Sequence, residues 1–254
     1  MRQITLGNSG LETSQLAIGT GTSGWAGASN QTRLGFNGCV ELLRYAYDRG
    51  ITFWDLADQY GSHPEAAAAL REVGRENVVI TSKTSSRTGT GVTSDVERFC
   101  RELDTDYVDT VLLHCLTQAD WTSRFVDSVE ALSRCQERGL VRAVGVSCHD
   151  LGAFQTAAAS PWVEVVLARI NYAGIQMDAP PPDVVPVIER MHAAGKGVYG
   201  MKVVGQGKLS HDVRGALRYV LELGCVDAIV LGMESLGEID ENVELMEELT
   251  VVPA

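Results

Sequence analysis

The segment Ile51-Thr52-Phe53-Trp54-Asp55-Leu56-Ala57-Asp58-Gln59-Tyr60-Gly61 holds the features that decide the fold. Its first four residues are β-branched or aromatic, which is typical of a short buried strand. Asp55 follows at once, and Tyr60 comes five positions later, before a helix that we predict over residues 64–73. An acid at a strand end, with a phenol returned above it by a loop, is typical of a ligand site. The structural alternative is that Asp55 caps the loop and Tyr60 packs by its ring.

Outward from this segment, apolar runs alternate with stretches of helical spacing to both ends of the chain. Residues 2–15 predict a hairpin that turns at Asn8-Ser9-Gly10. The main strands are expected at 16–18, 51–54, 78–80, 108–113, 141–146, 163–168, 197–201 and 228–231. Eight strand-plus-helix units in one domain spanning residues 1–254 predict a (β/α)8 TIM barrel. A doubly wound open sheet would need a Gly-x-Gly-x-x-Gly turn and an acid about 20 residues later, and neither is cleanly present.

The composition is that of a soluble globular protein, and its charge opposes polyanionic partners. The chain is 45% hydrophobic and carries a net charge of −12, which argues against binding to nucleic acid or to an anionic membrane. No apolar run approaches the roughly 18 residues that span a bilayer, and the N-terminus lacks a signal-peptide core, so we expect a cytoplasmic protein. The six cysteines show no Cys-x-x-Cys pair and no His at metal spacing, which predicts reduced thiols and no metal site.

Polar residues stand at nearly every predicted strand end, which is where a barrel carries its chemistry. In chain order the residues at these ends are Thr20, Asp55, Lys83, His114, Ser147, Asn171, Lys202 and Gly232. Asp55, Lys83 and His114 end three consecutive strands, so we expect them to converge beneath Tyr60. A lysine held by a carboxylate would stabilise the phenolate and lower a pKa that starts near 10, making Tyr60 a proton donor near neutral pH. A buried ion pair and a core histidine are the structural alternatives.

A glycine-rich loop follows the first strand of the predicted barrel. The strand ends in Gly19-Thr20-Gly21, and a loop with few side chains lets backbone amides approach a ligand, so these residues are candidate cofactor contacts. Trp25 in this loop and Trp121 after the 115–120 segment are candidate walls of a substrate pocket, although both could simply pack.

The sequence resembles those of the aldo-keto reductases along nearly the whole chain. The matching features are the N-terminal hairpin, Asp-x-Ala-x-x-Tyr-Gly at 55–61, Lys83, Leu-Leu-His at 112–114, Gly-Val-Ser at 145–147 and Gly-x-Gly-x-Leu at 205–209. The resemblance implies a TIM barrel, a nicotinamide cofactor that is usually NADPH, and carbonyl reduction by a tetrad of Asp, Tyr, Lys and His. Carried over residue by residue, the tetrad is Asp55, Tyr60, Lys83 and His114.

The resemblance also implies contacts to the cofactor. Ser147 matches the serine that holds the nicotinamide carboxamide, but Cys148 stands where the family has asparagine. The partner from the sixth strand is Arg169 or Asn171, which lie on the same side of that strand. The remaining candidate contacts are Lys202, Gly207, Leu209, Gly232, Glu238 and Asn242.

Two departures from the family pattern bear on specificity. Residues 232–242 match the adenosine-binding segment, yet Glu238 stands where many relatives place an arginine that clamps the 2′-phosphate. A carboxylate repels a phosphate and can accept a hydrogen bond from a ribose 2′-hydroxyl, so NADH is expected as an alternative to NADPH. The chain ends at Ala254, so the long C-terminal segment that shapes the pocket in many relatives is expected to be missing.

The resulting hypothesis is hydride transfer from a reduced nicotinamide to an aldehyde or ketone, with Tyr60 protonating the oxygen and His114 orienting the carbonyl. Lys83 would tune Tyr60, and Asp55 would hold Lys83. One alternative is a Schiff-base lyase that uses Lys83 or Lys202 as its nucleophile. Another is a nicotinamide-binding sensor subunit with little turnover. The carbonyl substrate, the physiological direction and the oligomeric state stay open.

Overall fold

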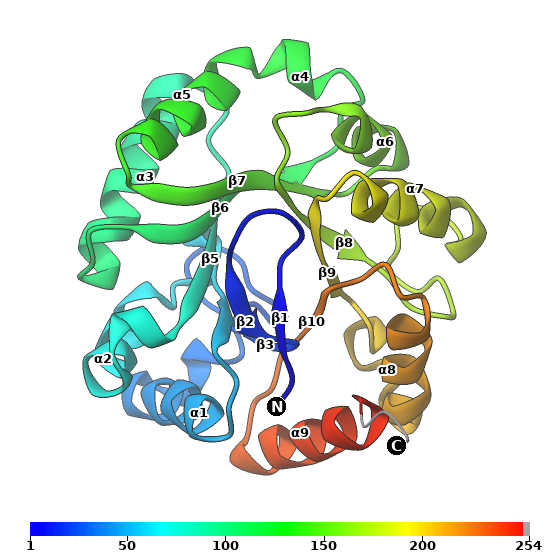
Figure 1. The fold of residues 1–254 in the computed structure, drawn as a ribbon. Coiled ribbons are helices and arrows are strands. Elements are labelled where there is room, and N and C mark those ends of the chain that lie inside the picture. The colour runs from blue at the N-terminus through cyan, green and yellow to red at the C-terminus, as the bar shows by residue number, and fades with distance from the viewer. Residues whose placement is uncertain (251–254) are drawn as a thin grey trace.

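The computed structural model describes residues 1–250, in which eight parallel strands close into a barrel surrounded by helices (Figure 1). The predicted (β/α)8 TIM barrel is therefore confirmed. The strands pair in the order β10-β3-β4-β5-β6-β7-β8-β9, and β10 closes on β3. Their bounds are β3 Leu16–Gly19, β4 Phe53–Asp55, β5 Val79–Thr84, β6 Val108–Leu116, β7 Val141–Cys148, β8 Val165–Arg169, β9 Gly197–Met201 and β10 Ala228–Leu231.

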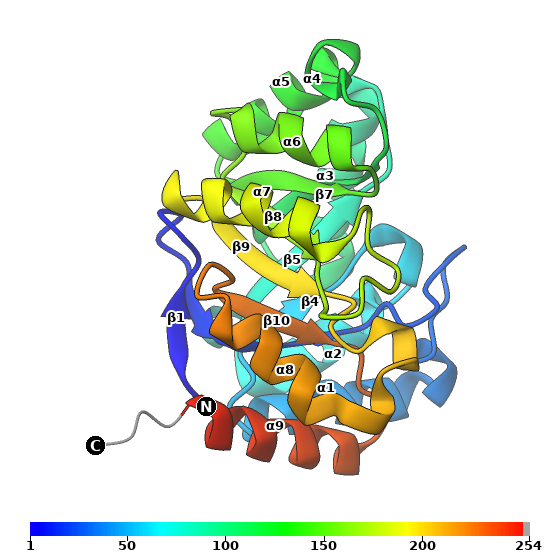
Figure 2. The same cartoon turned by 90° about the vertical axis from the view of Figure 1, so that its right-hand side faces the viewer.

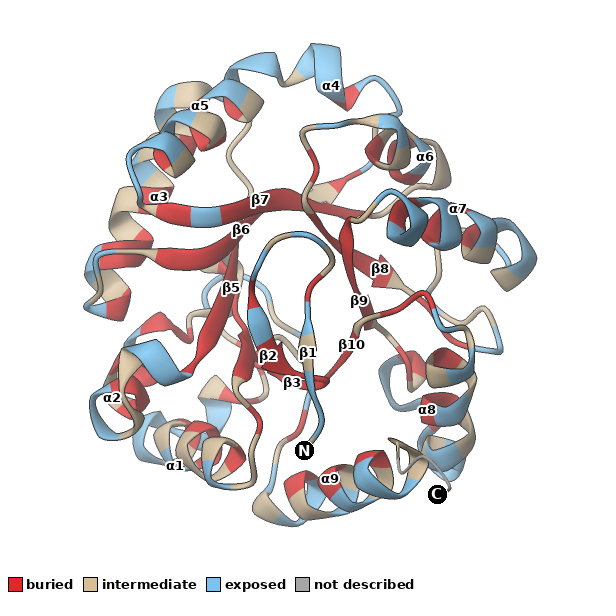
Figure 3. Cartoon of the chain, in the orientation of Figure 1, coloured by how far each residue is buried: buried red, intermediate tan, exposed pale blue. Residues whose placement is uncertain are grey.

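Helices follow the strands and cover the outside of the barrel. They are α1 Phe36–Asp48, α2 His63–Val73, α3 Gly89–Leu103, α4 Trp121–Arg124, α5 Val126–Glu137, α6 Leu151–Ala159, α7 Pro181–Ala193, α8 Val213–Glu222 and α9 Leu236–Thr250. In α3 the apolar stripe that the sequence spacing predicts, Val96, Phe99, Cys100 and Leu103, is buried. The burial map shows buried strands inside and helices that are buried on their inner face only (Figure 3).

A two-stranded hairpin precedes the barrel, as the sequence predicts. Strands β1 (Gln3–Thr5) and β2 (Glu12–Ser14) pair antiparallel, and the loop between them lies across one end of the barrel (Figure 1). Leu6 and Leu11 from this loop are buried against apolar residues of the barrel interior, among them Phe53 and Tyr199. The loop is therefore a plug that closes this end.

The opposite end of the barrel carries the loops that follow the carboxyl ends of the strands, as the side view shows (Figure 2). These loops include 3₁₀ segments η2 (Asp58–Tyr60) after β4 and η4 (Gly205–Gly207) after β9. No helix between Met1 and Thr250 is long and apolar enough to cross a membrane.

Candidate active site

Asp55 and Lys83 meet at the centre of the barrel's carboxyl end. Their strands β4 and β5 are paired, and β6, which carries His114, pairs with β5. Lys83 is fully buried, and its Nζ donates to Asp55 Oδ2 at 2.7 Å and to the Leu56 carbonyl at 2.7 Å. Three consecutive strands thus deliver the acid, the ammonium and the imidazole to one region.

Asp55 is held by a second group that the sequence did not single out. Tyr199 lies inside the barrel on β9, and its hydroxyl donates to Asp55 Oδ1 at 2.9 Å. The Tyr199 ring contacts Phe53, with 5.1 Å between centroids. Both carboxylate oxygens of Asp55 are therefore occupied, one by Lys83 and one by Tyr199, which fixes the orientation of the carboxylate.

Tyr60 lies above this ion pair at the end of η2. Its Oη is 3.5 Å from Lys83 Nζ, which also lies 4.7 Å from the centre of the ring. The glycine-rich loop packs against the other side of the ring. A Cβ at Gly21 would come within 2.4 Å of the ring, and one at Gly24 within 2.5 Å, so both positions need glycine for close approach.

His114 completes the group, with its ring edge-on to Tyr60 and 5.9 Å between centroids. Burial, reinforced by the positive charge of Lys83, lowers the pKa of His114 to about 2. The imidazole is therefore neutral at physiological pH. A neutral imidazole can donate a hydrogen bond to a carbonyl oxygen. Its Nδ1 is buried without a partner.

The expectation that Lys83 lowers the pKa of Tyr60 below its ordinary value is wrong. Burial raises the pKa of the phenol above its ordinary value of 10; Lys83 lowers it, but the negative charge of Asp55 opposes that effect. Tyr60 therefore keeps its proton at neutral pH. A protonated phenol is the form that a proton donor needs.

Lys83 is unsuited to act as a nucleophile. Burial lowers its pKa, but the neighbouring Asp55 and Tyr60 outweigh burial, and the net pKa of Lys83 is raised. The ammonium stays charged, and its donors are directed at Asp55, Leu56 and Tyr60. An uncharged amine would be required for Schiff-base chemistry.

A chain of polar contacts extends the site toward β8. Arg169 donates through Nη2 to His149 Nδ1 at 2.6 Å and pairs through Nη1 with Asp178 at 3.1 Å. Because Arg169 is always a donor, neutral His149 carries its proton on Nε2, which lies 3.6 Å from Cys115 Sγ. Burial, reinforced by Arg169, lowers the pKa of His149 to about 4, so the ring is neutral. Burial of Asp178 raises the pKa of its carboxyl to about 6, although Arg169 opposes the rise.

The structure separates the two candidates for the sixth-strand partner, because β8 ends at Arg169 and Asn171 lies in the loop that follows. Asn171 is fully buried, and its side-chain amide makes four bonds to the backbone, donating to Ile175 and Lys202 and accepting from Ala173 and Ile175. Its side chain is therefore committed to the loop. Arg169, in contrast, has a buried Nε without an acceptor. The hydroxyl of buried Ser147 accepts from the Cys115 amide at 3.3 Å, which leaves its proton for another partner.

The other predicted cofactor contacts lie at the ends of β3 and β10 or in the segment after β9. Thr20 is fully buried, and its hydroxyl bonds Ser62 and the Asp55 carbonyl, so its side chain ties the first two barrel strands together. Gly19 and Gly232 lie at the adjoining ends of β3 and β10, where a Cβ would meet Val230 and Thr22. Lys202, Gly207 and Leu209 follow β9; Lys202 is half-buried, Gly207 is exposed and Leu209 is buried.

Glu238 has a structural role that the sequence reading did not include. It lies in the first turn of α9, and its carboxylate accepts from the Glu234 amide at 2.7 Å, while the Ser235 hydroxyl accepts from the Glu238 amide at 3.2 Å. These reciprocal bonds resemble a capping box. Asn242 donates to the Glu238 carbonyl at 2.7 Å. The cap explains a glutamate here without reference to a cofactor.

The two tryptophans differ sharply. Trp25 is 68% exposed, and its loop is joined to η2 by a bond from the Gly27 amide to the Gln59 carbonyl at 3.0 Å. Trp25 therefore stands free beside the Tyr60 loop. Trp121 is fully buried; its Nε1 donates to the Ala153 carbonyl and its ring packs on Trp162. The expectation that Trp121 walls a pocket is corrected, because Trp121 is a core residue at the start of α4 and is bonded to α6.

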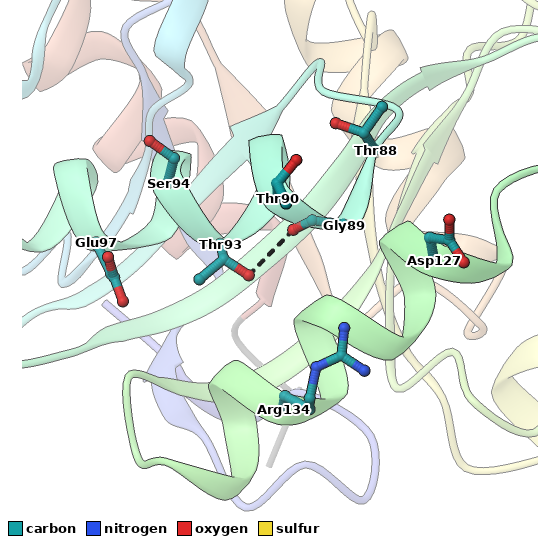
Figure 4. Close-up of a pocket in the computed structure, with 8 residues that line it drawn as sticks. All are labelled: Thr88, Gly89, Thr90, Thr93, Ser94, Glu97, Asp127 and Arg134. Atoms are coloured by element: carbon teal, nitrogen blue, oxygen red, sulfur yellow. Dashed lines mark hydrogen bonds between the residues drawn. The ribbon is translucent and has the colours of Figure 1, made fainter.

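A separate groove of ≈ 560 Å³ lies on the flank of the barrel, between α3 and α5 (Figure 4). It is lined by Thr88, Gly89, Thr90, Thr93, Ser94, Glu97, Asp127 and Arg134, none of which is buried. Among the lining residues, the Thr93 side chain donates through Oγ1 to the Gly89 carbonyl at 3.0 Å. This open groove contains no buried polar side chain, whereas Asp55, Lys83 and His114 at the barrel mouth are buried, so the mouth is the better candidate for the active site. Within residues 1–250, no group of three or more metal-ligating side chains is assembled.

Sequence reasoning missed three residues near this centre. Tyr199 lies within the predicted strand 197–201, where its hydroxyl is the only side-chain signal of a polar role. His149 follows the Ser147-Cys148 pair directly. Arg87 comes four residues after Lys83, in the loop after β5, and its guanidinium donates to the backbone carbonyl of His114.

Comparison with known proteins gives a consistent result. The sequence model described as "Aldo/keto reductase family" matches residues 15–215. An aldo-keto reductase of Bacillus subtilis is 27% identical over 61% of this chain and 50% of its own length. A probable aldo-keto reductase of Glycine max is 30% identical over 58% of this chain and 45% of its own. The matched part of this chain thus spans about half the length of these relatives.

Solved structures share the whole barrel. A Pseudomonas aeruginosa crystal structure, provisionally assigned to the aldo-keto reductases, aligns with a TM-score of 0.83 at 25% identity over 97% of this chain and 95% of that one. The aldo-keto reductase of Bombyx mori, solved in complex with NADP, aligns with a TM-score of 0.74 at 17% identity over 96% and 87% of the two chains. At that identity the second likeness concerns the fold alone.

Proposed function

Because this chain belongs to the aldo-keto reductase family, we propose that it reduces an aldehyde or ketone with NADPH or NADH. The observation that carries the proposal is the convergence of Asp55, Lys83, Tyr60 and His114 at the barrel mouth, with Lys83 Nζ 2.7 Å from Asp55 and 3.5 Å from Tyr60 Oη. Membership of the family makes redox chemistry the natural use of these groups. Location in the cytoplasm stays a prediction.

Each of the four residues has one role in this proposal. Tyr60 donates its Oη proton to the substrate oxygen as negative charge develops there. Lys83 stabilises the phenolate that remains, because its ammonium is held in place by Asp55. Neutral His114 orients the carbonyl by a hydrogen bond. Tyr199 is a positioning residue, since it acts on the substrate only through Asp55.

The barrel mouth also offers groups that fit a nicotinamide. Arg169 Nε is a buried donor without an acceptor, and the Ser147 hydroxyl retains a proton to donate. A carboxamide oxygen accepts hydrogen bonds from such donors, which favours Arg169 over Asn171 as the sixth-strand partner. A bound reduced nicotinamide supplies the hydride.

The choice between the two cofactors is a proposal of its own. The family favours NADPH, whereas the Glu238 carboxylate at the start of α9 adds negative charge where a 2′-phosphate would lie. Since that carboxylate also caps the helix, its presence alone does not select NADH. Fluorescence titration with NADPH and with NADH in parallel measures both affinities. If neither NADPH nor NADH bound, the proposed function would be overturned.

The decisive test of the mechanism is Tyr60→Phe. This change removes the proton donor and keeps the ring between Lys83 and the glycine loop, so we expect the reduction rate to fall by about a hundredfold or more. Cofactor affinity should stay within about twofold, because no cofactor contact is assigned to the hydroxyl. Undiminished turnover of a generic aldehyde would contradict the role of Tyr60. Absence of turnover in the native enzyme, with cofactor bound, would favour the sensor alternative.

A Schiff-base lyase remains a rival only through Lys202. Burial, together with Arg169, lowers the pKa of Lys202, whereas Lys83 stays protonated. Borohydride trapping of a carbonyl compound on the protein, without added nicotinamide, would select this rival.

A further inference from the structure

The mouth of the barrel is locally positive in a protein whose net charge is −12. Burial raises the pKa of the Cys115 thiol, which follows His114, and four cations among the described residues oppose that rise: Arg169, Lys83, Arg87 and Lys202. Two of these are neutralised, because Lys83 pairs with Asp55 at 2.7 Å and Arg169 with Asp178 at 3.1 Å. The other two, Arg87 and Lys202, form no ion pair with any carboxylate of residues 1–250.

Arg87 is held firmly without being neutralised. Its Nη2 donates to the His114 carbonyl and its Nη1 to the Ser86 carbonyl at 3.2 Å. The guanidinium lies 5.2 Å from the centre of the Phe125 ring. Burial lowers the pKa of Arg87, as expected where water is removed and no carboxylate replaces it. Three of its five N–H donors have no acceptor within the described part of the chain.

Arg87 and Lys202 lie in different parts of the mouth, one near His114 and the other among the candidate cofactor contacts. Arg87 follows β5 and Lys202 follows β9, and these strands are four apart in a closed barrel of eight, so they lie on opposite sides of the mouth. The candidate cofactor contacts lie elsewhere: Ser147 and Arg169 lie at the ends of β7 and β8, and Lys202 and Gly232 follow β9 and β10. Arg87 lies on the other side of this set, next to His114, where the substrate carbonyl would be oriented.

We propose that Arg87 binds a carboxylate of the substrate, so that the enzyme prefers aldehydes or ketones that carry an acid group. This inference rests on the proposed function. A carboxylate can accept hydrogen bonds from the three unused N–H donors of Arg87 and would neutralise its charge in a partly desolvated site. Because Arg87 is bonded to the backbone carbonyl of His114, an acid group bound to it would lie on the His114 side of the mouth.

The test compares matched substrates that differ in one charge. The pairs are succinic semialdehyde with butanal, and para-carboxybenzaldehyde with para-methylbenzaldehyde. In the native enzyme we expect kcat/KM for each acid to exceed that for its neutral partner. In Arg87→Met the acid-to-neutral ratio should fall by about tenfold or more, whereas Arg87→Lys, which keeps the charge but loses the planar fork, should recover part of it.

The ratio distinguishes recognition from a structural role. If Arg87 only anchored the end of β6, its loss would lower both members of a pair equally, and an unchanged ratio would overturn the proposal. Arg124→Met is the matched control, because exposed Arg124 lies over the same Phe125 ring, 5.9 Å from its centre, and makes no contact with His114. That control should leave the ratio unchanged.

A binding measurement separates failure of this inference from failure of the proposed function. Calorimetric titration with para-methylbenzoate, a carboxylate that cannot be reduced, needs no turnover. We expect binding to the native protein and about tenfold weaker binding to Arg87→Met. Equal affinity for the two proteins would overturn the role of Arg87. Reduction of neither member of each pair by the native enzyme would overturn the proposed function, while the titration still decides on Arg87.

Discussion

Tyr60 keeps its proton across the neutral range because burial and Asp55 together outweigh the influence of Lys83. A group whose pKa is raised is protonated below that pKa and loses its proton as the pH rises through it. Reduction that depends on the protonated phenol should therefore be constant from about pH 7 to about pH 9 and fall only above about pH 10. His114, with a pKa of about 2, adds no titration in this window.

The measurement is kcat/KM for a neutral aldehyde at constant ionic strength across that range. Tyr60→Phe serves as the reference for any background decline. A midpoint near pH 7 in the native enzyme would show that the phenol titrates far lower than its burial implies.

Gly21 offers a second prediction at the scale of single residues. In Gly21→Ala the new Cβ would lie within 2.4 Å of the Tyr60 ring, which must then shift from its present position beside Lys83. Because small displacements of a reacting group are costly, we expect kcat to fall by about tenfold or more with little loss of thermal stability. Gly237→Ala, with open space around it, is the control for stability. Full activity in Gly21→Ala would show that the position of the ring is not critical.

At the scale of elements, His63 joins α2, β5 and α3. It lies at the start of α2; its Nε2 contacts Ser82 Oγ at 2.9 Å and its Nδ1 contacts Glu102 Oε2 at 2.7 Å. The bond to His63, supported by Arg98, holds the pKa of Glu102 at about 2, well below its ordinary value of 4.5. A depressed pKa of this kind gives stability above the ordinary value that is lost as the pH falls toward about 2.

Glu102→Gln should therefore lower the urea midpoint of unfolding at pH 7, and the difference from the native protein should shrink as the pH falls below about 4.5. Glu97→Gln is the matched control on the same helix, because Glu97 forms only an exposed pair with Arg138. A difference between native protein and Glu102→Gln that stayed constant down to about pH 3 would refute the linkage.

The elements themselves could largely be predicted from the sequence. Every predicted strand is present, because apolar runs such as 108–113 are buried on both faces, as in any parallel barrel. The strand-end residues Asp55, Lys83 and His114 followed from the same reasoning. Three features could not be predicted because they depend on distances between residues far apart in the sequence. They are the bond from the Tyr199 hydroxyl to Asp55, the bonds of the Asn171 amide to nearby backbone groups, and the burial of Trp121.

At the scale of the whole molecule, the hairpin plug contributes to stability more than to chemistry. Leu6 is fully buried in the barrel interior with Leu11 and Phe53. Leu6→Ala should lower the free energy of unfolding by about 2–5 kcal/mol, since the barrel walls cannot collapse into the space. The half-buried Ile4 of the same hairpin is the control, and Ile4→Ala should cost less. Urea unfolding measures both, and equal losses would show that the plug is not part of the core.

The local charge of the mouth is also a property of the whole molecule. A net charge of −12 repels anions at long range, whereas Arg87 and Lys202 would attract them near the opening. Association of an acidic substrate should therefore depend on salt, because screening weakens both effects to different extents.

The plug formed by Leu6 and Leu11 closes the far end of a barrel whose interior is already filled by side chains. Water, protons and ligands therefore reach Tyr60 from the mouth. A molecule seated across that mouth would separate the phenolic proton from solvent, so the proton delivered in each catalytic cycle would have to be replaced before the mouth is covered again.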